Sequence, residues 1–131
     1  MKVPLNNLSP RLNNYRKSLM SAFGRVVDSG SLILGPEVMN FEEEFAKYLV
    51  AEHCVGVANG TDAIELALRA LGIDRGDEVA TVANAGMYTT SALLAIGAQP
   101  FFMDVDLHSK NVSFKEVEKA IKNGCKAIVI T

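Results

Sequence analysis

The chain has 131 residues, of which 49% are apolar and 21% are charged. This balance is typical of a globular protein with a buried core, and it excludes disordered and collagen-like chains. With 13 Lys and Arg against 15 Asp and Glu, the net charge is −2. No basic run is longer than a pair, so nucleic acid is not an expected partner.

Membrane-spanning and export segments are not indicated by the sequence. No stretch approaches the ~18 apolar residues that a membrane-spanning helix needs. Residues 1–7 turn polar at once and lack the apolar centre of a secretory leader. Cys54 and Cys125 lie in different apolar segments without Cys-x-x-Cys spacing, which is typical of reduced thiols. We therefore expect a cytoplasmic protein with no membrane partner.

Two helices are predicted before residue 50. Ser9 followed by Pro10 is typical of a helix start, because the serine oxygen caps free amides and proline needs no N–H there. Apolar residues then recur every three or four positions over 9–28, and Gly30 provides the stop. Gly35-Pro36 opens the second helix.

From residue 54 onwards, short apolar runs alternate with helical segments. Strands are predicted at residues 54–58, 78–82, 100–105 and 127–130, and helices at 62–71, 88–96 and 114–122. Strands joined by crossover helices form a mainly parallel sheet with helices on both faces, so the predicted fold class is α/β. The last strand ends with the chain, where an open α/β sheet would continue into a ligand-binding loop. We therefore expect this chain to be the front part of a longer protein.

The turn before the helix at 62–71 is a candidate anion site. Gly60, Thr61 and Asp62 stand where that helix begins, and unpaired amides at the positive end of a helix dipole bind phosphate. The alternative is structural, in which Asp62 and Glu65 form a reciprocal capping box; the pattern alone favours this alternative. Neither the Gly-x-Gly-x-x-Gly nor the P-loop pattern is present, which disfavours dinucleotide and P-loop enzymes.

Other polar side chains near strand ends are weaker indications of function. Tyr88 follows the strand at 78–82 and so belongs to the same sheet edge as Gly60, where its ring either stacks on a ligand or is an ordinary half-buried aromatic. The remaining carboxylates are typical of turns or caps, and the histidines lack further ligands at zinc spacing, so no metal site is expected. These residues are Asp104, Asp106, His53 and His108.

Five segments together resemble the DegT/DnrJ/EryC1/StrS aminotransferases, pyridoxal phosphate (PLP) enzymes that install amino groups on nucleotide-linked keto sugars. The similarity follows the order and spacing of the family's N-terminal portion over nearly the whole chain, with Gly-Val-Ala-Asn-Gly-Thr-Asp-Ala at 56–63. The segments are residues 35–49, 56–68, 76–79, 97–100 and 104–106. The resemblance implies the large domain of a PLP fold-type I enzyme. Residues 1–35 are then an N-terminal segment and helix, and residues 36–131 a truncated N-terminal part of the PLP-binding domain.

The resemblance also implies roles for individual residues. Gly60, Thr61 and Asp62 would hold the PLP phosphate, while an aromatic ring stacks on the pyridine. An ungapped alignment places the usual aromatic position at Gly86, so Tyr88, two residues later, is expected to take the stacking role. The family's Schiff-base lysine lies after the last strand, and no lysine of this chain stands in its motif. No catalytic residue is therefore assigned, and the 131 residues alone are expected to be inactive, because transamination requires that lysine.

The function implied is transfer of an amino group, from glutamate, to a nucleotide-linked keto sugar by a homodimer whose N-terminal segment lies near the subunit interface. Three alternatives stay open. A PLP-dependent sugar dehydratase of the same family shares this front part of the chain. A non-catalytic α/β module would bind a phosphorylated small molecule through Gly60-Thr61-Asp62. A remnant without function would be held by a partner that covers its open sheet edge.

Overall fold

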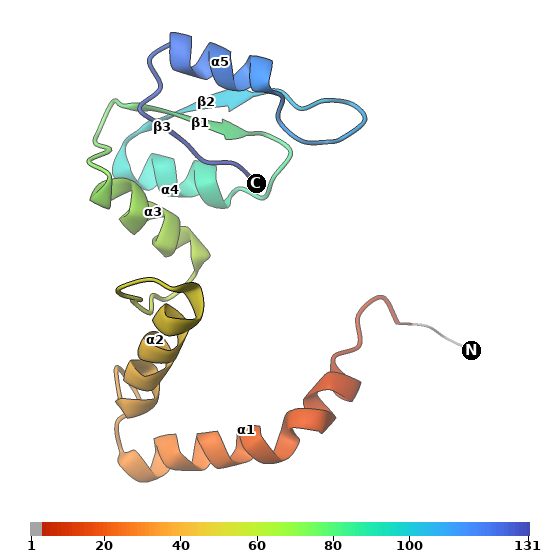
Figure 1. The fold of residues 1–131 in the computed structure, drawn as a ribbon, viewed down its shortest axis with the longest axis vertical. Helices are drawn as coiled ribbons and strands as arrows, with labels where there is room; N and C mark the ends of the chain where they lie inside the picture. The colour runs from red at the N-terminus through yellow and green to blue at the C-terminus, as the bar shows by residue number, and fades with distance from the viewer. Residues whose placement is uncertain (1–3) are drawn as a thin grey trace. The chain divides into compact units, whose positions relative to one another are not determined.

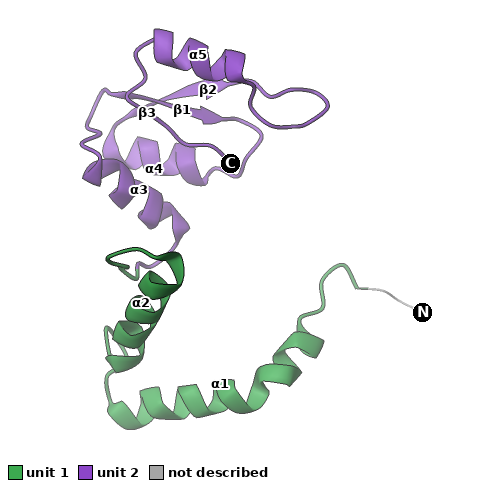
Figure 2. Cartoon of the chain, in the orientation of Figure 1, with its two compact units in different colours: residues 1–56 green, residues 57–131 purple. Residues whose placement is uncertain are grey.

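The structure is a computed structural model that describes residues 4–131. Contacts divide the chain into two compact units, one ending at Gly56 and the other beginning at Val57 (Figures 1 and 2). The division after residue 35 that the family resemblance implies stays a prediction. No helix in the described part of the chain is both long and apolar enough to cross a membrane.

The first unit begins with the helix α1 (Ser9–Ser29). It ends, as predicted, at Gly30, whose φ of 66° is left-handed. Its start differs from the prediction, because Ser9 is the first helical residue rather than the cap. The cap position is Leu8, which makes no side-chain cap hydrogen bond, and the Ser9 N–H donates to the Oδ1 of Asn7 over 3.1 Å, which satisfies one free amide of the first turn.

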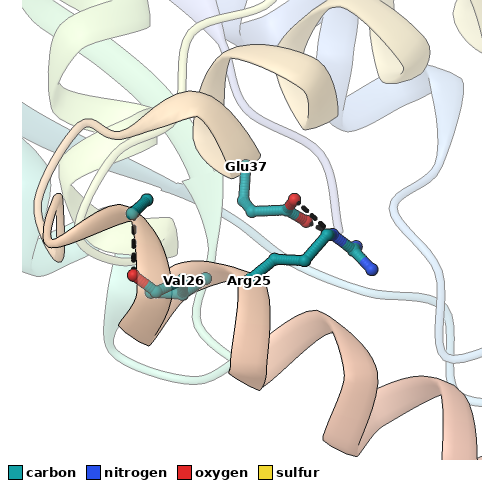
Figure 3. A network of polar contacts seen from close by, with 4 residues as sticks. Arg25, Val26 and Glu37 are labelled. Atoms are coloured by element: carbon teal, nitrogen blue, oxygen red, sulfur yellow. Dashed lines mark hydrogen bonds and ion pairs between the residues drawn. The ribbon is translucent and has the colours of Figure 1, made fainter.

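The second helix of this unit, α2 (Pro36–Leu49), begins after Gly35 as predicted. It is joined to α1 by Arg25 and Glu37, whose side chains form two hydrogen bonds of 2.7 and 2.8 Å (Figure 3). α1 buries none of its side chains, and α2 buries only that of Ala46. The first unit therefore contains little apolar core of its own.

The second unit has three layers. Its sheet is parallel, with the strand order β2-β1-β3. Helices α3 and α4 cover one face of the sheet, and α5 covers the other (Figure 1). The elements are α3 (Gly60–Ala70), β1 (Glu78–Val82), α4 (Tyr88–Ile96), β2 (Gln99–Met103), α5 (Phe114–Lys122) and β3 (Ala127–Ile128). The predicted α/β class, with a parallel sheet covered on both faces, is confirmed.

The central strand β1 contributes to two apolar clusters, one on each face of the sheet. Val79 packs with Leu93 and other residues of α3 and α4, whereas Ala80 packs with Ala120 of α5. Successive residues of a strand point to opposite faces, and Val79 and Ala80 are both completely buried. β1 therefore fixes the position of both helical layers, and with them the loops at its carboxyl end.

One predicted strand does not form. Residues 54–58 have no strand structure, and Val55 is 75% exposed. The prediction was wrong because an apolar run becomes a strand only beside another strand that accepts and donates its backbone hydrogen bonds. Residues 4–131 supply no such neighbour for this segment. The bounds of β1, α4 and α5 agree with the prediction, while β2, β3 and α3 differ at their ends.

Candidate functional site

The amino end of α3 carries two backbone amides for which residues 4–131 provide no acceptor. Asn59 is the cap residue: its Oδ1 accepts from the N–H of Asp62 over 3.0 Å, and its carbonyl oxygen accepts from the N–H of Ala63 over 3.1 Å. The amides of Gly60 and Thr61 have no hydrogen-bond partner in the part of the chain that the structure describes. Unpaired amides at the positive end of a helix form an anion-binding position.

The reciprocal cap of α3 joins Asn59 to Asp62. The Oδ2 of Asp62 accepts from the Nδ2 of Asn59 over 3.0 Å, while Glu65 accepts from the Nε of Arg69 over 3.1 Å. The predicted capping box of Asp62 with Glu65 was wrong because the helix begins at residue 60 rather than 62. Asn59 was missed as a site residue, although asparagine is one of the strongest N-cap residues. Asp62 lines a separate hollow beside Glu65 and Leu66.

A hollow of about 420 Å³ brings the start of α3 together with the start of α4. Its lining consists of Asn59, Gly60, Thr61, Ile64 and Tyr88. Tyr88 is the first residue of α4 and is 66% exposed, so its ring is accessible. Three of the four predicted cofactor-binding residues therefore lie around one hollow, and only Asp62 lies outside it.

The turn between β1 and α4 packs Gly86 against Tyr88. A Cβ atom added to Gly86 would lie 2.8 Å from the Cδ2 of Tyr88 and 3.2 Å from its Cζ. The same turn is attached to the loop after β2, because the Nδ2 of Asn84 donates to the carbonyl oxygen of Lys110 over 3.1 Å. The position of the Tyr88 ring thus depends on the path of this turn, which is fixed by the Asn84–Lys110 hydrogen bond at one end and by the start of α4 at the other.

The carboxylates that follow β2 stabilise their own loop. The Oδ1 of Asp106 accepts from the N–H groups of Ser109 (2.8 Å) and His108 (3.1 Å). These bonds, those from Ser109 first, hold the pKa of Asp106 below its usual range. The prediction that Asp106 is a turn residue is confirmed. Among residues 4–131, no group of three or more His, Cys, Asp or Glu residues is arranged to hold a metal ion.

Residues 13–131 match the DegT/DnrJ/EryC1/StrS aminotransferase family. The chain belongs to this family. A dTDP-3-amino-3,4,6-trideoxy-alpha-D-glucose transaminase from Micromonospora megalomicea subsp. nigra is 46% identical to it over 114 residues, which are 87% of this chain and 30% of that protein. The resemblance inferred from the sequence motifs is therefore confirmed.

Solved structures of the family have the same fold. S. venezuelae DesV in complex with a ketimine intermediate matches with a TM-score of 0.87 and 38% identity, covering 97% of this chain and 34% of DesV. The PLP-form of the putative sugar aminotransferase Spr1654 from Streptococcus pneumoniae matches with a TM-score of 0.72 and 28% identity, covering 81% of this chain and 28% of that one. The chain thus spans about a third of the length of these family members.

Proposed function

We propose that this chain supplies the phosphate-binding turn and one wall of the ring slot of a PLP-dependent aminotransferase. The observation that supports this most directly is that the two unpaired amides, of Gly60 and Thr61, border the same hollow as the ring of Tyr88. A phosphate accepts hydrogen bonds from such amides, and an aromatic ring stacks on a flat pyridine. The residues around the hollow therefore fit a phosphorylated pyridine.

Each residue of the hollow has a separate task in this proposal. The amides of Gly60 and Thr61 donate to the phosphate, and the Thr61 hydroxyl adds a donor. A Cβ added to Gly60 would meet no atom within 4 Å apart from its chain neighbours and the backbone of its own helix turn, so the space beside it is open to a ligand. Asp62 acts from outside the hollow, because its bonds to Asn59 fix the end of the helix.

Binding and orienting are the contributions of these residues to the reaction. PLP, when bound, supplies a carbonyl carbon and an electron-withdrawing ring, through which an amino group passes from a donor to an acceptor. Stacking on Tyr88 and anchoring of the phosphate hold the ring in one orientation. The chain has no lysine in the family's Schiff-base motif, so the 131 residues by themselves bind the cofactor without catalysing transfer.

The substrate class in this proposal is a nucleotide-linked keto sugar, with glutamate as the amino donor. It is supported by the name of the Micromonospora relative, a transaminase of a dTDP-linked amino sugar. The enzyme is proposed to act in the cytoplasm as a homodimer, with the segment that contains α1 near the subunit interface.

The test compares the protein expressed from its complete coding sequence with its Thr61→Val variant. Loss of a hydrogen bond to a charged phosphate weakens binding by about ten- to a hundredfold, so the PLP dissociation constant should rise by that factor. Thr90→Val, a similar change on α4 away from the hollow, serves as the control. Transfer from glutamate to a dTDP-linked keto sugar is measured in the same samples. An unchanged PLP affinity in Thr61→Val would contradict the proposed phosphate site.

A further inference from the structure

We infer that Gly86 is a positioning residue for the stacking ring. Because Gly86 has no side chain, the ring of Tyr88 lies against residue 86, at the wall of the hollow formed by Asn59, Gly60, Thr61 and Ile64. This inference rests on the proposed function, since the ring it positions is the one that would stack on PLP. It assigns to Gly86 a role in cofactor binding without any contact of its own with the cofactor.

The distances show how little room residue 86 has. The three atoms nearest to a Cβ on Gly86 all belong to the ring of Tyr88: Cε2 is the nearest, Cδ2 would be 2.8 Å away and Cζ 3.2 Å. These atoms form one edge of a rigid ring, so a small rotation of a flexible side-chain end would not relieve the overlap. A methyl group at residue 86 and the present position of the Tyr88 ring therefore exclude each other.

The backbone offers no easy way to relieve the overlap. Tyr88 begins α4, and that helix is anchored in the core by four buried residues, Thr89, Ala92, Leu93 and Ile96. On the other side, Asn84 is bonded to the carbonyl oxygen of Lys110. With both ends of the turn fixed, a side chain at residue 86 changes the rotamer of Tyr88 and moves its ring away from the hollow.

The test is a double-mutant cycle in the protein expressed from its complete coding sequence. The variants are Gly86→Ala, Tyr88→Ala and the double variant, and the readouts are the PLP dissociation constant, the visible circular dichroism of bound PLP, and the dissociation constant of inorganic phosphate. Gly86→Ala should weaken PLP binding by up to about tenfold, which is the effect of losing an aromatic stacking contact. It should have no further effect in the Tyr88→Ala background, because the ring that it displaces is then absent.

Two controls separate positioning from general damage. Gly24→Ala adds a methyl group where no atom lies within 4 Å, and it should leave PLP binding unchanged. Tyr88→Phe keeps the ring, so Gly86→Ala should still weaken PLP binding in the Tyr88→Phe background, unlike in the Tyr88→Ala background. Inorganic phosphate should bind all variants alike, because its donors belong to Gly60 and Thr61.

The outcomes distinguish this inference from the proposed function. If the unaltered protein binds PLP but the effects of Gly86→Ala and Tyr88→Ala simply add, the role of Gly86 is wrong and the proposed function stands. If Gly86→Ala weakens phosphate and PLP equally, the residue only maintains the fold, and the inference is also overturned. If the unaltered protein binds neither PLP nor phosphate, the proposed function and this inference fail together.

Discussion

The guanidinium of Arg25 donates to both carboxylate oxygens of Glu37, with its Nε 2.7 Å and its Nη2 2.8 Å from them (Figure 3). Two parallel hydrogen bonds between a guanidinium and a carboxylate restrict orientation more than a single ion pair does. The pair joins α1, which buries none of its side chains, to the first turn of α2. Its hydrogen bond and charge keep the pKa of Glu37 below its usual range.

Replacing Arg25 by glutamine should raise the pKa of Glu37 towards its ordinary value. A lowered carboxyl pKa stabilises the folded state above the pKa of the unfolded chain, and this contribution is lost as the pH falls through the folded-state pKa. The difference in the free energy of unfolding between the wild type and Arg25→Gln should therefore disappear in acid. NMR titration of the Glu37 carboxyl checks the shift. Arg16→Gln on the same helix is the control and should leave that titration unchanged.

Gly60→Ala should affect folding and ligand binding in opposite directions. The added methyl group meets no atom within 4 Å apart from its chain neighbours and the backbone of its own helix turn, and alanine is the better helix former, so the free energy of unfolding should rise by up to about 1 kcal/mol. The same methyl group occupies space that a phosphate needs in order to reach the amide, so PLP affinity should fall. Urea unfolding and PLP titration of one preparation test both. A parallel loss of stability and affinity would contradict the open approach at Gly60.

Asp77 links the turn before β1 to the residue before β3. Its Oδ1 lies 2.7 Å from the Nζ of Lys126, and its Oδ2 accepts from the N–H of Asp74 over 2.9 Å. Lys126 first, and then the Asp74 amide, hold the pKa of Asp77 below its usual range. Asp77→Asn should lower the midpoint of thermal unfolding at neutral pH. The difference should shrink as the pH falls through the lowered pKa, because the wild-type carboxyl is then protonated.

Thermal unfolding of both proteins at neutral pH and at about pH 3 tests this dependence. The exposed Asp28 provides the matched control, since Asp28→Asn should have little effect at either pH. An equal difference between wild type and Asp77→Asn at both values would show that the charge of Asp77 is not the cause.

Thr81 is an unusual residue for the centre of β1, because its hydroxyl is buried and has no hydrogen-bond partner among residues 4–131. The residue is only 1% exposed. Thr81→Val removes the unpaired oxygen at nearly constant shape, so the free energy of unfolding should rise by about 1 kcal/mol. Val82→Thr, the reverse change one residue later, should lower it. Denaturant unfolding measures both, and a destabilising Thr81→Val would mean that the hydroxyl has a partner in the complete protein.

Local patterns were enough to predict the bounds of α4 and α5. Both helices are short, the apolar residues of α5 recur at helical spacing, and α4 ends at Gly97, which takes a left-handed φ of 78°. The segment at 54–58 could not be predicted in the same way, because strand formation depends on a neighbouring strand that can come from any part of a sequence. The start of α3 was misplaced since the cap at Asn59 precedes the apolar pattern.

The candidate site was predicted in part. Gly60 and Tyr88 were expected at one edge of the sheet because each would follow a parallel strand. The structure brings them to one hollow, although the first of those strands is absent. The packing of α3 against α4 brings Gly60 and Tyr88 together in place of the missing strand. The contact of Gly86 with Tyr88 was not predictable from composition or spacing, because it depends on the path of the turn and the rotamer of one tyrosine.

β1 and β2 end level with each other, since Val82 pairs with Met103, and both of these residues are buried. The exposed residues Asn84 and Asp104 follow within two positions of the strand ends. In the proposed function, the buried strands carry folding stability, whereas recognition of the cofactor belongs to the residues around the hollow of Gly60, Thr61 and Tyr88. Substitutions and insertions in the loops can alter what the protein recognises while the layers beneath keep their packing. Such a separation allows new specificities to evolve without the loss of stability that changes in a core would cause.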